Sequence, residues 1–393
     1  MAGDLLVLGY FKYAGFLAAN LNALVSTQLT VNILLPVGIS FYTFTQIAFL
    51  VDAHRGEVAR YQLPYYALFV TYFPHLIAGP ILHHKDVIPQ FEQERSKRPD
   101  PHLVRCGLII FSIGLFKKTC IADAIQPFVA LGFGPTPPSF DQAWIGALAY
   151  TFQLYFDFSG YSDMAIGISL MFGIFLPLNF NSLYKAKKHH RFLAPLAYDV
   201  VAISPRLSLY PAWRQPARHR AALCQPDDHH GAWWPLARSG LDFRRVGRPA
   251  RGVSLRQSRL EQIRAAHPAA AGGPANIAAF ALTFLSVAVA WVFFRADSVT
   301  SAIAIVSRMA RPDLFVYDDR ERLAAAYVII FGLIAFFAPN TQQLLGYDHA
   351  SRKVGISFAD NVTSSGLFYT AACLLAFGIL GIQKHSEFIY FRF

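Results

Sequence analysis

Polar side chains that can carry charge or move protons gather between Phe152 and Asp163, inside a much longer apolar run. Gln153 and Asp157 are four residues apart, as are Ser159 and Asp163, so on a helix each pair shares a face. A carboxylate in apolar surroundings is costly unless it faces a protein interior or a water-filled cavity. We therefore expect inward-facing residues that either line a reaction chamber or form polar contacts between packed helices: Gln153, Asp157, Ser159, Tyr161 and Asp163.

A second candidate group lies around residues 72–80, which read Tyr-Phe-Pro-His-Leu-Ile-Ala-Gly-Pro. Pro74 and the Gly79-Pro80 pair interrupt a helix, and a broken helix often lines a site. His75 is either a catalytic or gating residue or a hydrogen-bonded packing residue. We expect Gly79 and Pro80, together with Asn179 and Asn181, to shape the same chamber as the polar residues of 152–163.

The elements that must position these residues are predicted to be membrane helices. The 393-residue chain is 54% hydrophobic and only 15% charged, and apolar runs close to the roughly 20 residues that cross a bilayer recur along it. The sequence thus predicts an all-α, polytopic integral membrane protein with roughly eight membrane segments, some broken or re-entrant. The four cysteines have neither metal-ligand nor redox spacing, so we expect no metal site and no disulfide framework.

The formal net charge of +11 comes largely from one internal stretch. Residues 187–260 are rich in Arg, His and Pro and hold no run able to cross a membrane, whereas residues 1–186 and 261–393 carry the predicted membrane helices. This division predicts three segments. Because the basic excess is local, it does not indicate a nucleic-acid partner.

Several segments, taken in order, resemble the membrane-bound O-acyltransferase family and, within it, the bacterial branch that acetylates alginate. The matching stretches are residues 8–13, 35–41, 73–80, 155–167, 178–186, 291–296 and the terminal 388–393. The resemblance implies an enzyme of the bacterial cytoplasmic (inner) membrane that crosses the lipid bilayer several times. It would move an acyl group, acetyl by resemblance, from a cytoplasmic-side donor to an exported polysaccharide such as alginate. It further implies an acyl-CoA or acyl-carrier donor, no bound cofactor, and accessory periplasmic or membrane acetylation proteins.

The family's two histidine motifs, Arg-Arg-Trp-His and Trp-His-Gly, cannot be read in this chain. Histidine suits acyl transfer because its neutral ring can accept a proton near neutral pH. If codon boundaries in residues 187–260 are moved one base downstream, both motifs can be spelled, with the two histidines falling across Ala197 and Tyr198 and across Ala237 and Arg238. We therefore expect a frame-displaced, poorly ordered segment, no intact catalytic residue, and an inactive translated form.

Two further expectations concern the start of the chain and its function class. Relatives of this kind carry additional membrane segments before the element at residues 8–13, so we expect a truncated or misassigned N-terminus. The alternative functions are a transporter or channel lined by Asp157, Asp163 and the broken segment at 74–80, and a membrane scaffold whose basic loop contacts anionic partners.

Overall fold

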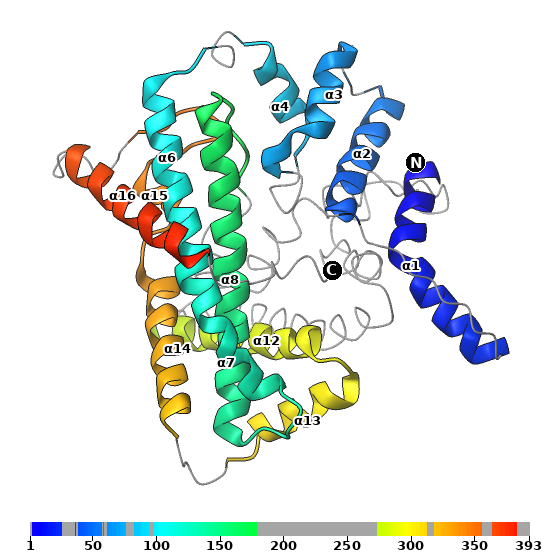
Figure 1. The fold of residues 1–393 in the computed structure, drawn as a ribbon, viewed down its shortest axis with the longest axis vertical. Coiled ribbons are helices and arrows are strands. Elements are labelled where there is room, and N and C mark those ends of the chain that lie inside the picture. Colours follow the sequence, from blue (N-terminus) through cyan, green and yellow to red (C-terminus); the bar gives the residue numbers. More distant parts are fainter. Residues whose placement is uncertain are drawn as a thin grey trace. The chain divides into compact units, whose positions relative to one another are not determined.

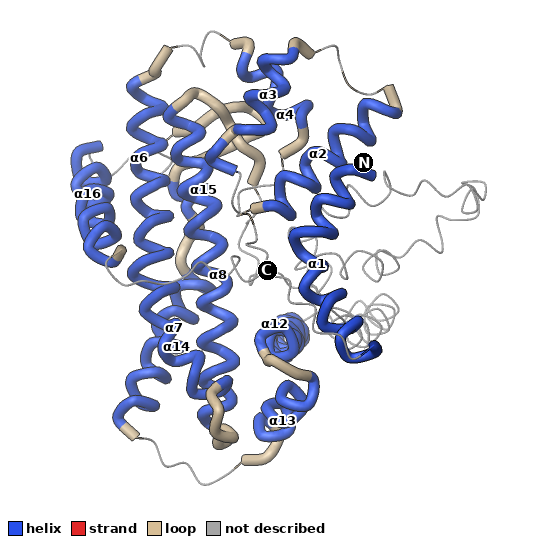
Figure 2. Tube along the Cα trace, turned by 45° about the vertical axis from the view of Figure 1, so that its right-hand side comes forward, coloured by secondary structure: helices blue, strands red, loops and turns tan. Residues whose placement is uncertain are grey.

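The structure is a computed structural model of the chain. It describes residues 2–25, 36, 38–56, 58, 61–75, 82–93, 98–178, 273–312, 318–355 and 364–382. Within these ranges the regular structure is helical, and the one β contact is an isolated bridge between Asp348 and Lys353. Figure 2 shows helices joined by short loops, with no strand in the part that is described. The predicted segment 187–260 lies outside the described residues, together with residues 179–186 before it and 261–272 after it.

The prediction of a polytopic membrane bundle is wrong on this structure. Among the described helices, none is both long and apolar enough to cross a membrane. The apolar runs end early or are interrupted by polar residues. The run that begins at Pro64 forms only the nine-residue helix α3 (Leu63–Thr71), and the 32-residue helix α8 (Phe140–Met171) carries Asp157 and Asp163 within it.

The described residues fall into two compact units that interleave along the chain. The first unit takes in residues 1–120, 157–179 and 339–393, and the second takes in residues 121–156 and 180–338. Helix α8 contributes its later part to the first unit and its earlier part to the second.

The first unit holds a run of four helices from the N-terminal part of the chain and a second group built around α6. In the run, α1 (Ala2–Val25) contacts α2 (Ile39–His54), which contacts α3, which in turn contacts α4 (His84–Phe91). Helix α3 ends before Pro74, and a 3₁₀ turn, η1 (Phe73–His75), follows. Helix α6 (Pro101–Phe116) lies beside α8, and α16 (Ser364–Gly381) packs across α6 (Figure 1).

The second unit holds α7 (Asp123–Phe133), the earlier part of α8, α12 (Gly273–Arg295), α13 (Val299–Met309) and α14 (Asp319–Phe337). Its interior includes an aromatic cluster in which the Phe152 ring stacks on Phe284, with Phe336 edge-on to both. One polar contact ties α8 to α14, since Gln142 Nε2 donates to Glu321 Oε1 at 2.7 Å.

Local sequence explains where the site helices begin and end. Asp100 caps α6 by accepting from the His102 backbone N–H at 2.9 Å, and Pro101 occupies the first turn, where no N–H partner is needed. Helix α8 ends at Met171, and Gly173 just beyond it has φ 74° and donates its N–H to the Leu170 carbonyl. The Ile174 N–H donates to the Ser169 carbonyl, completing a Schellman motif that glycine favours.

Two pairs of glycines let α6 and α8 approach closely. A Cβ added to Gly114 would lie 2.6 Å from the Gly160 carbonyl oxygen, and one added to Gly107 would lie 2.5 Å from the Gly167 carbonyl oxygen. A Cβ added to Gly160 or Gly167 on α8 would likewise meet backbone atoms of α6. Backbone contact at this distance excludes any side chain. The glycine seam, defined by these four residues, brings the polar side chains of the two helices within reach of each other.

Candidate functional site

The later part of α8 buries the polar residues that the sequence singled out. The side chains of Asp157 and Asp163 are each 1% exposed, and Ser159 is buried beside them. Tyr161 is only partly buried on the same helix. Gln153 is buried too, but on the part of α8 that belongs to the second unit, so the structure does not bring it into this group.

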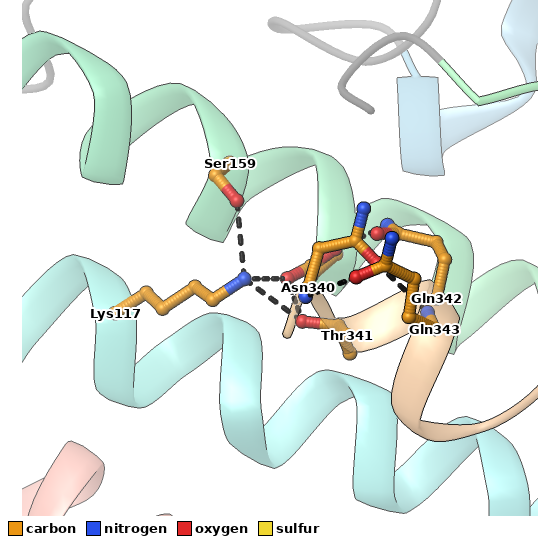
Figure 3. A network of polar contacts seen from close by, with 7 residues as sticks. Lys117, Ser159, Asn340, Thr341, Gln342 and Gln343 are labelled. Carbon is orange, nitrogen blue, oxygen red and sulfur yellow. Dashed lines mark hydrogen bonds and ion pairs between the residues drawn. The ribbon is translucent and has the colours of Figure 1, made fainter. Parts of the chain in front are cut away.

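Lys117 is the centre of the group, as Figure 3 shows. Its Nζ donates to Asp163 Oδ2 at 2.7 Å, to Thr341 Oγ1 at 2.8 Å and to Ser159 Oγ at 3.1 Å. Asp163 is itself well supplied with donors, because Thr341 Oγ1 donates to Oδ2 at 2.6 Å and Gln342 Nε2 donates to Oδ1 at 2.8 Å. Charge-assisted hydrogen bonds of this kind are short and strong.

Lys118 forms a second buried ion pair with the other acid. Its Nζ lies 2.8 Å from Asp157 Oδ1, and its side chain is 15% exposed. The two lysines are adjacent in sequence, whereas the two acids are six residues apart on α8. The two lysines are the first residues of η2 (Lys117–Ala122), a π-helical stretch that follows directly on α6. Such stretches are rare and are often found at functional sites.

A short helix from the C-terminal part of the chain closes the group. Helix α15 (Thr341–Leu344) starts with a capping box in which the Asn340 side chain accepts from the Gln343 N–H at 2.8 Å, and the Gln343 side chain accepts from the Asn340 N–H at 3.1 Å. This cap, drawn in Figure 3, fixes the first turn of α15. The turn carries Thr341 and Gln342, the two side chains that donate to Asp163.

The geometry decides what this group can do chemically. A lysine beside a serine suggests a base and a nucleophile, yet all three donor positions of the Lys117 ammonium are already engaged with oxygen acceptors. Lys117 thus has no lone pair with which to activate Ser159. Two lysines face two carboxylates, so the group is balanced in charge and offers no site for an anion. Its contacts favour polar bonding between packed helices, and a chamber lined by Asp157, Ser159, Tyr161 and Asp163 stays a prediction.

The other predicted site residues lie at the edge of the described residues or outside them. His75 closes the 3₁₀ turn η1, which fixes its backbone, while its side chain is not described. Gly79, Pro80, Asn179 and Asn181 lie outside the described residues, as do the positions 197–198 and 237–238 where the displaced histidines would fall.

A second titratable group was missed by the sequence reasoning. His84, the first residue of α4, is 2% exposed, and its Nε2 lies 3.2 Å from Oδ2 of Asp52, which is fully buried on α2. On its other side, His84 Nδ1 lies 3.2 Å from the Tyr61 hydroxyl. The signal was the run His83-His84-Lys85-Asp86, a polar cluster next to an apolar segment.

Side chains that commonly bind metal ions are dispersed in the part of the chain that the structure describes. No three His, Cys, Asp or Glu side chains gather there in a way that would hold an ion. Asp52 and His84 meet as a pair, and Cys106, Cys120 and Cys373 are free thiols.

The sequence of this chain is similar to those of known acyltransferases. Residues 6–194 match the model of the membrane-bound O-acyltransferase family. The chain is 36% identical to a peptidoglycan O-acetyltransferase of Helicobacter pylori, over 98% of this chain and 80% of that protein. It is 34% identical to a probable alginate O-acetylase AlgI of Azotobacter vinelandii, over 99% of this chain and 83% of that protein. A teichoic acid D-alanyltransferase of Bacillus subtilis is 29% identical over 40% of each chain.

These likenesses define the class as an acyltransferase. The chain belongs to the membrane-bound O-acyltransferase family, as the sequence motifs predicted.

Proposed function

We propose that this protein is a polysaccharide O-acetyltransferase that works at the bacterial cytoplasmic membrane. It takes an acetyl group from a donor on the cytoplasmic side, of the acyl-CoA or acyl-carrier type, and passes it to an exported polysaccharide such as alginate, with the help of accessory acetylation proteins. The observation that carries this proposal is the likeness, over nearly the whole chain, to proteins named alginate O-acetylase and peptidoglycan O-acetyltransferase. The two names give alginate and peptidoglycan as the acceptors of the acetyl group.

We infer in addition that the chain as printed does not carry out this transfer. The two family histidines are absent because residues 187–260 are read in a displaced frame. Support comes from the family match, which ends at residue 194, a few residues into that segment. In this proposal the polar group around Lys117 has a structural role, because its contacts to Asp163 link the end of α6, α8 and α15.

The test compares two genes in an alginate-producing host that lacks its own acetylase. One gene encodes the chain as printed, and the other has the frame restored across residues 187–260. We expect ester-linked acetate on the exported alginate only with the restored gene. Acetylation by the printed chain would refute the inferred inactivity, and no acetylation by the restored protein, when it accumulates in the membrane fraction, would refute the proposed function.

Within the restored protein, Asp157→Ala tests the polar group. It removes the carboxylate that pairs with the Lys118 ammonium, so we expect acetate transfer to fall while the protein still accumulates. The matched control is Asp319→Ala, which removes a carboxylate from an exposed ion pair and is expected to leave transfer unchanged. Equal transfer by the Asp157→Ala protein and the unchanged protein would remove Asp157 from the site.

A further inference from the structure

Asp52, His84 and Tyr61 form a hydrogen-bonded chain that leads from the protein interior toward its surface. Asp52 is fully buried, and His84 is 2% exposed. Tyr61, which lies just before α3, is partly exposed. His84 stands between the other two, with 3.2 Å to the Asp52 carboxylate on one ring nitrogen and 3.2 Å to the Tyr61 hydroxyl on the other. All three belong to the first unit and lie outside residues 187–260.

The chemistry of the partners fixes the direction of the hydrogen bonds. A carboxylate only accepts, so Nε2 of His84 carries the proton and donates it to Asp52. Nδ1 is then the acceptor, and the Tyr61 hydroxyl donates to it. This is the arrangement in which a carboxylate orients a neutral imidazole as a base toward a hydroxyl.

The surroundings keep the imidazole neutral and therefore able to accept a proton. Burial is the largest effect and lowers the pKa of His84, the Asp52 carboxylate opposes it, and the charges of Lys85 and His83 lower the pKa further. The ring of Phe49 lies edge-on at 5.3 Å between centroids and adds apolar cover. His84 is also the first residue of α4, where the helix dipole disfavours a cation.

Tyr61 is the partly exposed member of this hydrogen-bonded series. Burial is the main effect on its pKa and raises it, and Lys85 and Glu92 act in opposite directions. The phenol thus stays protonated near neutral pH. A neutral hydroxyl can take a proton on its lone pair while it gives its own proton to Nδ1, so it can pass a proton inward without ionising first.

We propose that Tyr61, His84 and Asp52 form an acid–base relay that hydrolyses small activated acyl esters at the Tyr61 hydroxyl. This is an activity beyond the polysaccharide transfer proposed above, and it needs neither the polysaccharide nor residues 187–260. Water attacks the acyl carbon and forms the new C–O bond. The proton of the water passes to Tyr61 as the Tyr61 proton passes to His84 Nδ1, and the imidazolium is stabilised by Asp52. The ester C–O bond breaks, the leaving alcohol departs with the bonding pair, and the relay returns the proton to it.

The probe is p-nitrophenyl acetate, an activated acetyl ester, supplied to the full printed chain extracted in mild detergent. General acid–base catalysis contributes roughly 10²- to 10⁴-fold. We expect p-nitrophenolate release above the protein-free rate, and a loss of at least about tenfold in Tyr61→Phe, which keeps the ring and removes only the hydroxyl. The matched control is Tyr65→Phe, four residues further along the chain and packed against the same core, with an expected rate equal to that of the unchanged protein.

A pH profile separates catalysis from a structural role. The rate of the unchanged protein should rise with pH through an inflection below pH 6.5, because the pKa of His84 is lowered from that value, and His84→Gln should lose the inflection. The proposal is overturned by release no faster than without protein, by equal rates for Tyr61→Phe and Tyr65→Phe, or by an inflection that survives in His84→Gln. The result is independent of the transfer proposal, since a chain that acetylates no polysaccharide can still show Tyr61-dependent ester turnover.

Discussion

Replacing Lys117 by methionine isolates the contribution of a buried ion pair. The change removes the ammonium but keeps a long apolar side chain, so the effect is electrostatic rather than a matter of volume. Asp163, 1% exposed, is left buried without its cation. Breaking a buried ion pair by removing one partner costs about 3–5 kcal/mol. Asp163 keeps two neutral donors, Thr341 and Gln342, and Lys117 is itself 16% exposed, so we expect the lower end, about 3 kcal/mol.

The assay is urea unfolding of the full chain followed by circular dichroism, with a companion variant and a control. In Lys117→Met/Asp163→Asn the buried charge is also removed, so the loss should be smaller than the sum of the two single losses, by about 1–3 kcal/mol. Arg322→Met removes one partner of an exposed pair at 3.5 Å, whose side chains are 70% and 101% exposed, and should cause no measurable loss. If Lys117→Met unfolds at the same urea concentration as Arg322→Met, the reasoning about the buried pair is refuted.

Three further changes test other parts of the first unit. Gly114→Ala places a Cβ 2.6 Å from the Gly160 carbonyl oxygen and should cost about 1–3 kcal/mol in urea unfolding, whereas Gly15→Ala, which meets open space on α1, should be neutral or slightly stabilising. Gln90→Leu removes a side chain that accepts from the Phe175 N–H at 2.8 Å and donates to the Phe175 carbonyl at 2.9 Å, and should cost about 2–4 kcal/mol because two buried backbone groups lose these hydrogen bonds; an unfolding curve like that of the unchanged protein would contradict this. Because the folded-state pKa of His84 is lowered, its contribution to stability is fully present above pH 6.5 and is lost as the pH falls from 6.5 to the folded pKa. His84→Gln should flatten that part of the stability curve measured by thermal unfolding, and an unchanged slope would show that another group is responsible.

The burial of Asp157, Ser159 and Asp163 could be predicted from the sequence, because two acids inside an apolar helical pattern must face protein rather than lipid or open water. Their partners could not. Lys117 meets Asp163 across 46 residues of sequence and Thr341 across 224, and no local pattern encodes contacts over such separations. The Asn-Thr-Gln-Gln sequence at 340–343 has the residue types of a capping box, but it does not reveal that the first turn contacts Asp163.

His84 was missed for a related reason. Its neighbours His83, Lys85 and Asp86 suggest an exposed polar link, and its partner Asp52 lies 32 residues earlier at the end of another helix. The membrane-spanning prediction failed in a different way. Composition reports how apolar a stretch is, whereas a membrane-spanning helix must be long and apolar at once. Helix α3 is only nine residues long and ends before Pro74, and the 32-residue helix α8 is long enough but carries Asp157 and Asp163 within it.

The glycine seam fixes the axial alignment of α6 and α8. Gly107 faces Gly167 and Gly114 faces Gly160, so the two notches on each helix are seven residues apart, two helical turns. Sliding α6 by one turn would bring Ile110 or Phe111 against the α8 backbone, where there is no room for a side chain, and would carry Lys117 away from Asp163. Steric fit and charge pairing thus select the same alignment. A docking of these helices one turn out of place would therefore lose both the close backbone packing and the Lys117–Asp163 ion pair.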